Sequence, residues 1–174
     1  MATPFFSLLL DSSRLQRIRR NHGLEHATIH VLTEKNPRRS IAGHSDSGGF
    51  WLFGNLTIEE TKTAVEEALH RLRAGERQLA VHPNCGTNIA VSGAAAGLFG
   101  ALSMAGAGNK RGALFERLPL AILLSTVALI VTRPLGMRLQ EKVTTTGDPG
   151  SLEILEIRQS QRGNLIMHRV ETRS

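Results

Sequence analysis

Three histidines and a glutamate lie close together in the stretch NHGLEHATIH, residues 21–30. His22, His26 and His30 are spaced four residues apart, and Glu25 completes the pattern H-x-x-E-H. In a helix, imidazoles four residues apart project side by side and can chelate one cation. Glu25 lies on the same side and can orient or deprotonate a water held by that cation, as the glutamate of zinc peptidases does. The pattern therefore indicates a metal site with a built-in general base.

A second motif, HPNC at residues 82–85, offers the further ligand that two histidines lack. Zinc needs at least three protein ligands, and His82 and Cys85 stand three residues apart. Cys85 is the only cysteine of the chain, and a thiolate at a helix N-terminus is favoured by the helix dipole. The predicted metal is zinc or another divalent transition metal, and its predicted ligands are His22, His26, His82 and Cys85.

The first motif is predicted to lie on a helix between residues 11 and 37, opened by an Asp-Ser-Ser cap and closed at an Asn-Pro pair. At 100° per residue, His22, Glu25 and His26 fall within the apolar arc of this helix, about 100° wide. A buried polar group without a partner costs about 1–3 kcal/mol, so these side chains need partners. His30 lies at the edge of the arc, and a hydrogen-bonding role is expected for it.

The other elements are short, and they predict a small α+β module. Three further histidines, His44, His70 and His168, are expected at its surface. Thr57 begins a capping box, T-x-x-E, which opens a helix that stops at Gly75. The remaining predicted elements are a β-hairpin over residues 40–57, a short strand over 78–81, a turn-rich linker over 144–150 and a second β-hairpin over 151–172.

Two uncharged stretches predict a transmembrane helical hairpin. Residues 89–107 are long enough for one crossing. Residues 118–132 are strongly aliphatic, and the crossing extends over 114–137 if Arg117 and Arg133 reach the two interfaces. The alternative is a buried helical hairpin of a soluble α/β domain. We favour the membrane, because the second stretch is too apolar all round for a surface helix.

The predicted fold class is thus α+β, a small soluble module of two helices and β-hairpins with an inserted transmembrane hairpin. The predicted domains are a metal-site module over 1–88, the transmembrane hairpin over 89–137, and a linker with a C-terminal hairpin over 138–174. Basic residues are more numerous on the flanks of the hairpin than in its connecting loop, which places both termini in the cytoplasm. The N-terminus lacks the form of a secretory signal, so we expect the inner (plasma) membrane.

The composition of the chain indicates which partners to expect. The formal net charge is +6 and the sequence pI is about 10.7, so anionic surroundings are favoured. Aromatic residues make up only 4% of the chain and no nucleic-acid module is recognisable, so we expect membrane lipids and not nucleic acid. Gly93, Gly97 and Ala101 form a stripe of small residues on which a membrane partner or a second copy can pack.

The two motifs together resemble the YqhQ family of bacterial membrane proteins. Its members carry an HG-x-EH segment and a later HP-x-CGT segment that leads into a hydrophobic helix, and the resemblance covers about residues 21–105. The stretch from GFWLFGNLT to HPNCGTN is also similar to a smaller family of short bacterial membrane proteins of unknown function. The resemblance implies a metal-dependent enzyme with a shared site at His22, Glu25, His26, His82 and Cys85.

Three functions fit these residues. The first is a membrane-embedded zinc-dependent hydrolase of the peptidase type, with Glu25 as the general base. The second is a non-enzymatic assembly or scaffold protein with a closed structural site of four ligands. In the third, no metal binds, and the histidines and Cys85 form a hydrogen-bonded cluster.

Overall fold

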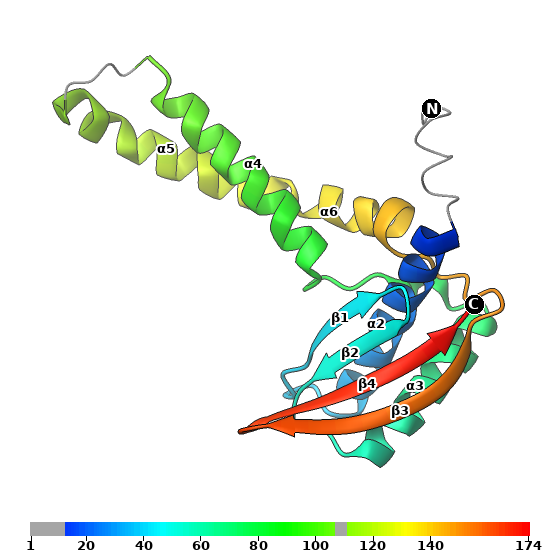
Figure 1. Ribbon diagram of the computed structural model, residues 1–174. Coiled ribbons are helices and arrows are strands. Elements are labelled where there is room, and N and C mark those ends of the chain that lie inside the picture. The colour runs from blue at the N-terminus through cyan, green and yellow to red at the C-terminus, as the bar shows by residue number, and fades with distance from the viewer. Residues whose placement is uncertain (1–12, 107–110) are drawn as a thin grey trace. The chain divides into compact units, whose positions relative to one another are not determined.

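The computed structural model describes residues 13–106 and 111–174, and it confirms the predicted α+β class. The chain divides into two compact units (Figure 1). The first unit contains the chain through His82 and again from Glu141 onward, and the second contains Pro83–Gln140. The Asp-Ser pair expected to begin the helix cap, residues 11 and 12, lies outside the described residues.

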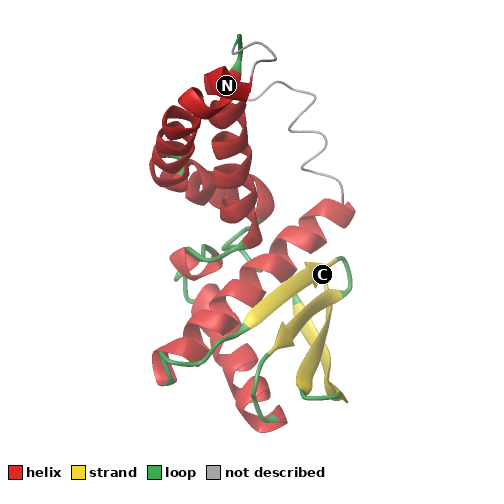
Figure 2. Cartoon of the chain, turned by 90° about the vertical axis from the view of Figure 1, so that its left-hand side faces the viewer, coloured by secondary structure: helices red, strands yellow, loops and turns green. Residues whose placement is uncertain are grey.

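The first unit is a two-layer structure in which both of its α-helices lie on one face of a four-stranded antiparallel sheet (Figure 2). The strand order is β1-β2-β4-β3, so the C-terminal hairpin adds to the N-terminal one and both predicted hairpins are confirmed. The elements are α2 (Ser13–Lys35), β1 (Ala42–Asp46), β2 (Gly49–Phe53), α3 (Ile58–Arg73), the 3-10 helix η1 (Arg77–Ala80), the π-helical turn η2 (Gln140–Thr144), β3 (Glu153–Arg162) and β4 (Leu165–Arg173).

The core of this unit lies between the helices and the sheet. Alternate residues of a strand face opposite sides, and Phe50 and Leu52 of β2 and Val170 of β4 are fully buried on the inward face. The helices cover this face with small and branched side chains. The fully buried apolar residues of α2 and α3 are Leu24, Ala27, Val31, Val65 and Ala68.

Local signals in the sequence set the limits of α3. Thr57 Oγ1 accepts the Glu60 N–H at 3.1 Å, and the Glu60 carboxylate accepts the Thr57 N–H at 2.9 Å, so the predicted capping box is confirmed. The helix ends just before Gly75, which adopts a φ of +98°.

The predicted strand over residues 78–81 is wrong, because the chain forms the 3-10 helix η1 there. A short apolar run does not by itself distinguish a strand from a buried turn of helix. The run packs against α2 and α3, and none of the described strands pairs with it.

The second unit is helical, with α4 (Gly86–Met104), α5 (Arg111–Val131) and α6 (Arg133–Leu139). Gly86–Met104 and Gly112–Val131 are long and apolar enough to cross a membrane. Only 11% and 6% of these two stretches are buried, whereas the core helix of a soluble protein is mostly buried. The structure interrupts the predicted crossing over 114–137 at Thr132, because Pro134 in the first turn of α6 lacks the N–H that would continue the α5 ladder.

Small and polar side chains join α4 to α5. Ser125 Oγ donates to the Ala96 carbonyl at 3.0 Å, and a side chain at Gly100 would stand 2.7 Å from Ser125 Oγ. Near the loop, the Arg117 guanidinium donates to the carbonyls of Ser103 and Ala105 at the C-terminal end of α4. The close approach of the two helices depends on these small residues.

Candidate metal centre

The H-x-x-E-H motif lies in the middle of α2, where the helix is buried around nearly its whole circumference and not along one face only. Glu25 is 4% exposed and His26 is 1% exposed, while His22 is half-buried. These polar side chains therefore occupy positions where a hydrophobic core would otherwise continue. Each of them needs a partner that the surrounding elements supply.

The main chain fixes the orientation of both helical histidines. His22 Nδ1 lies 3.0 Å from the Thr144 carbonyl oxygen, and His26 Nδ1 lies 2.8 Å from the Ala80 carbonyl oxygen. A carbonyl oxygen only accepts, so each Nδ1 must carry the proton and donate it. In this tautomer Nε2 carries the lone pair that binds a metal, which is the usual arrangement of metal-binding histidines.

Four imidazoles form a continuous histidine cluster in the first unit, made of His22, His26, His82 and His30. The ring centroids are 4.4 Å apart for His22 and His26, 5.8 Å for His26 and His82, and 4.9 Å for His82 and His30. His30 Nε2 lies 3.0 Å from the carbonyl oxygen of Val81, the residue that follows η1. His30 therefore has the hydrogen-bonding role expected for it.

His82 stays uncharged in this cluster. Burial, together with the neighbouring His30 and His26, lowers its pKa to about 4. A neutral imidazole is the form that binds a metal. Among the predicted ligands, His22, His26 and His82 are thus brought together by the packing of η1 against α2.

Cys85 is the N-cap residue of α4, and the Thr87 N–H points to its Sγ at 3.5 Å. It follows His82 by three residues, so the chain limits the separation of their Cα atoms to about 11 Å. His22, His26 and Cys85 form a group of side chains that could hold one metal ion.

The Glu25 carboxylate lies against β1. It accepts a hydrogen bond from the Ser45 hydroxyl, and a side chain at Gly43 would overlap its other oxygen, so the bare backbone at Gly43 leaves room for the carboxylate as it stands. Burial raises the pKa of Glu25, and the Ser45 hydrogen bond and the nearby His22 and His44 oppose this shift. The sequence pattern did not reveal Gly43 and Ser45 as neighbours of Glu25, because they lie some twenty residues away in a different element.

The sequence also gave no sign that residues 144–150, expected to be a linker, would contribute to the centre. The Thr144 carbonyl nevertheless orients His22, as described above. A main-chain carbonyl has no signature in the sequence, because all residues carry the same carbonyl group whatever their side chain. The linker becomes recognisable as a part of the centre only when its path across α2 is known.

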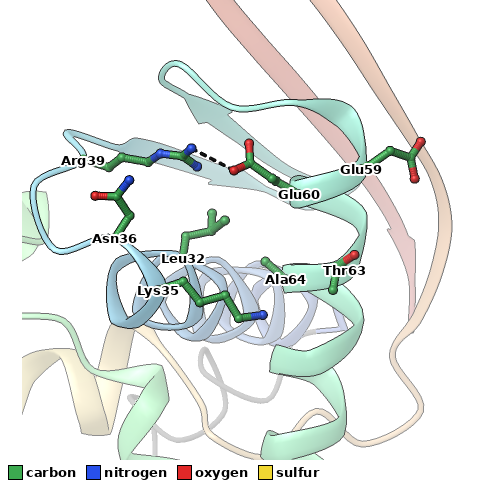
Figure 3. A pocket seen from close by; sticks show the side chains of 8 residues that line it. All are labelled: Leu32, Lys35, Asn36, Arg39, Glu59, Glu60, Thr63 and Ala64. Atoms are coloured by element: carbon green, nitrogen blue, oxygen red, sulfur yellow. Dashed lines mark ion pairs between the residues drawn. The ribbon is translucent and has the colours of Figure 1, made fainter.

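A hollow of about 400 Å³ lies elsewhere in the first unit, between the end of α2 and the start of α3 (Figure 3). Its charged rim is already paired, since Arg39 contacts Glu60 at 2.7 Å and Lys35 contacts Glu67 at 2.7 Å. The Arg39 partner lowers the pKa of Glu60 to about 2. The hollow has no histidine or cysteine, and the metal-binding chemistry lies with the histidine cluster.

A family model described as a domain of unknown function, DUF6391, matches residues 17–157. The chain belongs to this family. The match spans both motifs, the two long apolar helices and the segment that orients His22, so the DUF6391 domain includes every part of the candidate centre. The comparisons give no support to the resemblance to the YqhQ family.

The DUF6391 chain is also similar to an uncharacterized protein of Picosynechococcus sp.. The two are 34% identical over 157 residues, which cover 82% of this chain and 72% of the relative. No solved structure matches the chain.

Proposed function

We propose that this DUF6391 protein is an integral membrane metal-binding protein that holds zinc or another divalent transition metal at His22, His26 and Cys85. The observation that carries the proposal is the pair of hydrogen bonds from Nδ1 of His22 and His26 to main-chain carbonyls. These bonds leave Nε2 as the basic nitrogen on two imidazoles that stand one helical turn apart. A thiolate with two neutral imidazoles suits zinc.

The activity that best fits this centre is metal-dependent hydrolysis of the peptidase type. Three protein ligands leave a coordination position for the reaction, as in catalytic zinc sites. Glu25 supplies the general base. The next residue, His26, is a ligand, and burial raises the pKa of Glu25 toward the working range of such a base. Ser45 and Gly43 would hold the carboxylate in place.

A structural site is the second candidate, favoured by the position of His82. Its ring lies next to His26 and its pKa of about 4 keeps it neutral, but it is outside the group His22, His26 and Cys85, so it would have to move closer to serve as a fourth ligand. A closed site of this kind would suit a non-enzymatic assembly or scaffold protein.

The test begins with elemental analysis of the full chain, purified in detergent without a histidine tag. We expect one equivalent of metal, and its loss in His22→Ala and His26→Ala. The Glu25→Gln variant should keep the metal but lose hydrolysis of a fluorogenic peptide library by about 10²- to 10⁴-fold, the usual contribution of a general base. Glu66→Gln, an exposed change on α3, is the matched control and should keep both properties.

Each other result has a defined meaning. Absence of stoichiometric metal from the wild type would overturn both metal functions. Loss of metal in Glu25→Gln would make the glutamate a ligand or a structural group. Bound metal with four protein ligands and no hydrolysis would favour the scaffold function.

We further propose that the protein resides in the inner (plasma) membrane with both termini in the cytoplasm. Strands before and after the helical unit pair in one sheet, so they must lie on the same side of any membrane that α4 and α5 cross. Membrane lipids are its expected surroundings. A side chain at Gly93 or Gly97 would meet nothing within 4 Å, so these glycines are not used in the contact with α5 and suit a second copy or another membrane helix.

A further inference from the structure

The chain that returns from the helical unit runs across helix α2 beside the histidine cluster. We define the return segment as residues 142–150. Its main chain bonds to α2 at two levels, through Thr146 N–H to the Arg19 carbonyl at 3.1 Å and through the Thr144 carbonyl to His22 Nδ1 at 3.0 Å. The return segment thus contacts the helix about one turn before His22 and at His22 itself.

Gly23 makes this close path possible. A side chain at Gly23 would overlap the Thr146 carbonyl oxygen, and it would also stand 3.3 Å from the Ala80 side chain. A helix interior normally favours alanine over glycine by about 1 kcal/mol. The return segment therefore explains the glycine inside H-G-L-E-H, because the segment passes where a side chain at Gly23 would stand.

Gly147 makes a similar close contact with η1. A side chain there would stand 2.6 Å from Arg77 Cβ and 2.7 Å from the Arg77 carbonyl oxygen. The return segment orients His22 through Thr144, and it contacts η1, which provides the Ala80 carbonyl that orients His26. The main chains of α2, η1 and the return segment meet at Gly23 and Gly147.

Arginines of α2 hold the return segment in place. The Arg19 guanidinium donates to the carbonyls of Lys142 and Thr145, each at 3.2 Å. Arg20 packs against Gly150, whose φ of +53° is in the left-handed region. These contacts are separate from the imidazoles, so they can be weakened without changing a ligand.

We infer that Gly23 and Gly147 are positioning residues for the metal centre, because they seat the return segment so that its Thr144 carbonyl selects the metal-binding tautomer of His22. The inference rests on the proposed metal-binding function. It assigns to the return segment the control of metal affinity. Groups that orient a ligand in this way change metal affinity by about 10- to 100-fold when they are removed.

The test uses the full chain in detergent, stripped of metal and titrated with Zn²⁺ against a competing chelator. We expect Gly23→Ala and Gly147→Ala to raise the Kd for Zn²⁺ by about 10- to 100-fold. Gly93→Ala is the matched control, since a side chain there meets nothing within 4 Å, and its Kd should equal that of the wild type. Arg19→Met loosens the return segment without overpacking it, and should weaken binding even if a glycine variant fails to fold.

A second measurement needs no metal. In ¹⁵N-histidine-labelled protein, the wild type should show His22 with its proton on Nδ1, and the three variants should show a mixture of tautomers. A purely structural role of the glycines would lower thermal stability without changing this tautomer. The His22 signal is assigned from its absence in His22→Gln.

The outcomes separate this inference from the proposed function. If the wild type binds no Zn²⁺, the proposed function fails, and the tautomer measurement alone decides whether the return segment orients His22. If the wild type binds Zn²⁺ and all three variants bind it equally well with His22 unchanged, the inference is overturned and the proposed function stands.

Discussion

At the scale of single residues, the buried histidines fall into two kinds. His22 and His26 have carbonyl partners that fix their tautomers. His168 is fully buried on β4, and neither of its ring nitrogens has a hydrogen-bond partner among the described residues. The expectation that His168 lies at the surface is wrong, because the register of β4 places it on the inward face with Val170 and Thr172. His44 and His70 are exposed, as expected.

His168 should make the fold sensitive to acid. Burial lowers its pKa below the ordinary value, against a smaller opposite effect of Glu60. The unfolded chain then binds a proton as the pH falls through about 6.5 while the folded chain does not, so stability present above that pH is lost below it. One such group changes the free energy of unfolding by at most about 1.4 kcal/mol per pH unit.

The measurement is the thermal midpoint of the full chain between about pH 8 and about pH 5, the range in which histidine titrates. His168→Leu should reduce this dependence to the part that His82, whose pKa is also lowered, contributes, and the exposed His70→Leu should leave it as in the wild type. Equal slopes for the wild type and His168→Leu would show that the buried ring is not the acid-sensitive group.

At the scale of elements, local signals in the sequence decide where helices begin and packing decides what they contact. The Thr57 capping box starts α3 where the sequence predicts it. The run at residues 77–80, in contrast, takes its conformation from its neighbours. It forms a 3-10 helix that packs against α2, and the Ala80 carbonyl faces His26.

Removal of the cap should destabilise the first unit. In Thr57→Ala the Glu60 N–H loses its side-chain acceptor, and the loss of a helix cap costs about 1 kcal/mol. Thr63→Ala, an exposed change on the same helix, is the control and should leave stability nearly unchanged. Chemical denaturation followed by circular dichroism gives both values. A Thr57→Ala variant as stable as the control would mean that packing alone sets the start of α3.

At the scale of the whole molecule, one folded unit is interrupted in the sequence by another. The first unit is complete only when the chain returns from the helical unit, because β3 and β4 close its sheet. The helical unit exposes large apolar side chains along both long helices, including Leu98, Phe99, Phe115, Ile122 and Ile130. In water such a surface would associate, whereas lipid would cover it.

Membrane insertion predicts a specific sensitivity of α5. Ile122 is 65% exposed within the apolar stretch, so Ile122→Arg should oppose insertion by about 2.5–3.5 kcal/mol. Ile122→Val is the matched control. Carbonate extraction of membranes should leave the wild type and the control in the membrane fraction and release a large part of the arginine variant. If the wild type itself is released, the helices belong to a soluble assembly.

The sequence by itself determined the features that depend on local spacing. Its spacing put the H-x-x-E-H motif on a helix, turn residues marked both hairpins, and composition marked α4 and α5 as apolar enough for a membrane. These properties depend on residues a few positions apart, so a single chain displays them without knowledge of its fold.

Only the tertiary structure decided which groups orient the histidines. The Thr144 and Ala80 carbonyls stand 122 and 54 residues from their imidazoles in the chain, and main-chain atoms have no sequence pattern. The spacing in NHGLEHATIH assigns no role to Gly23, and the structure shows the return segment crossing over it. The sequence supplied the candidate ligands, and long-range packing decided their tautomers, because an imidazole takes its proton position from the group it faces.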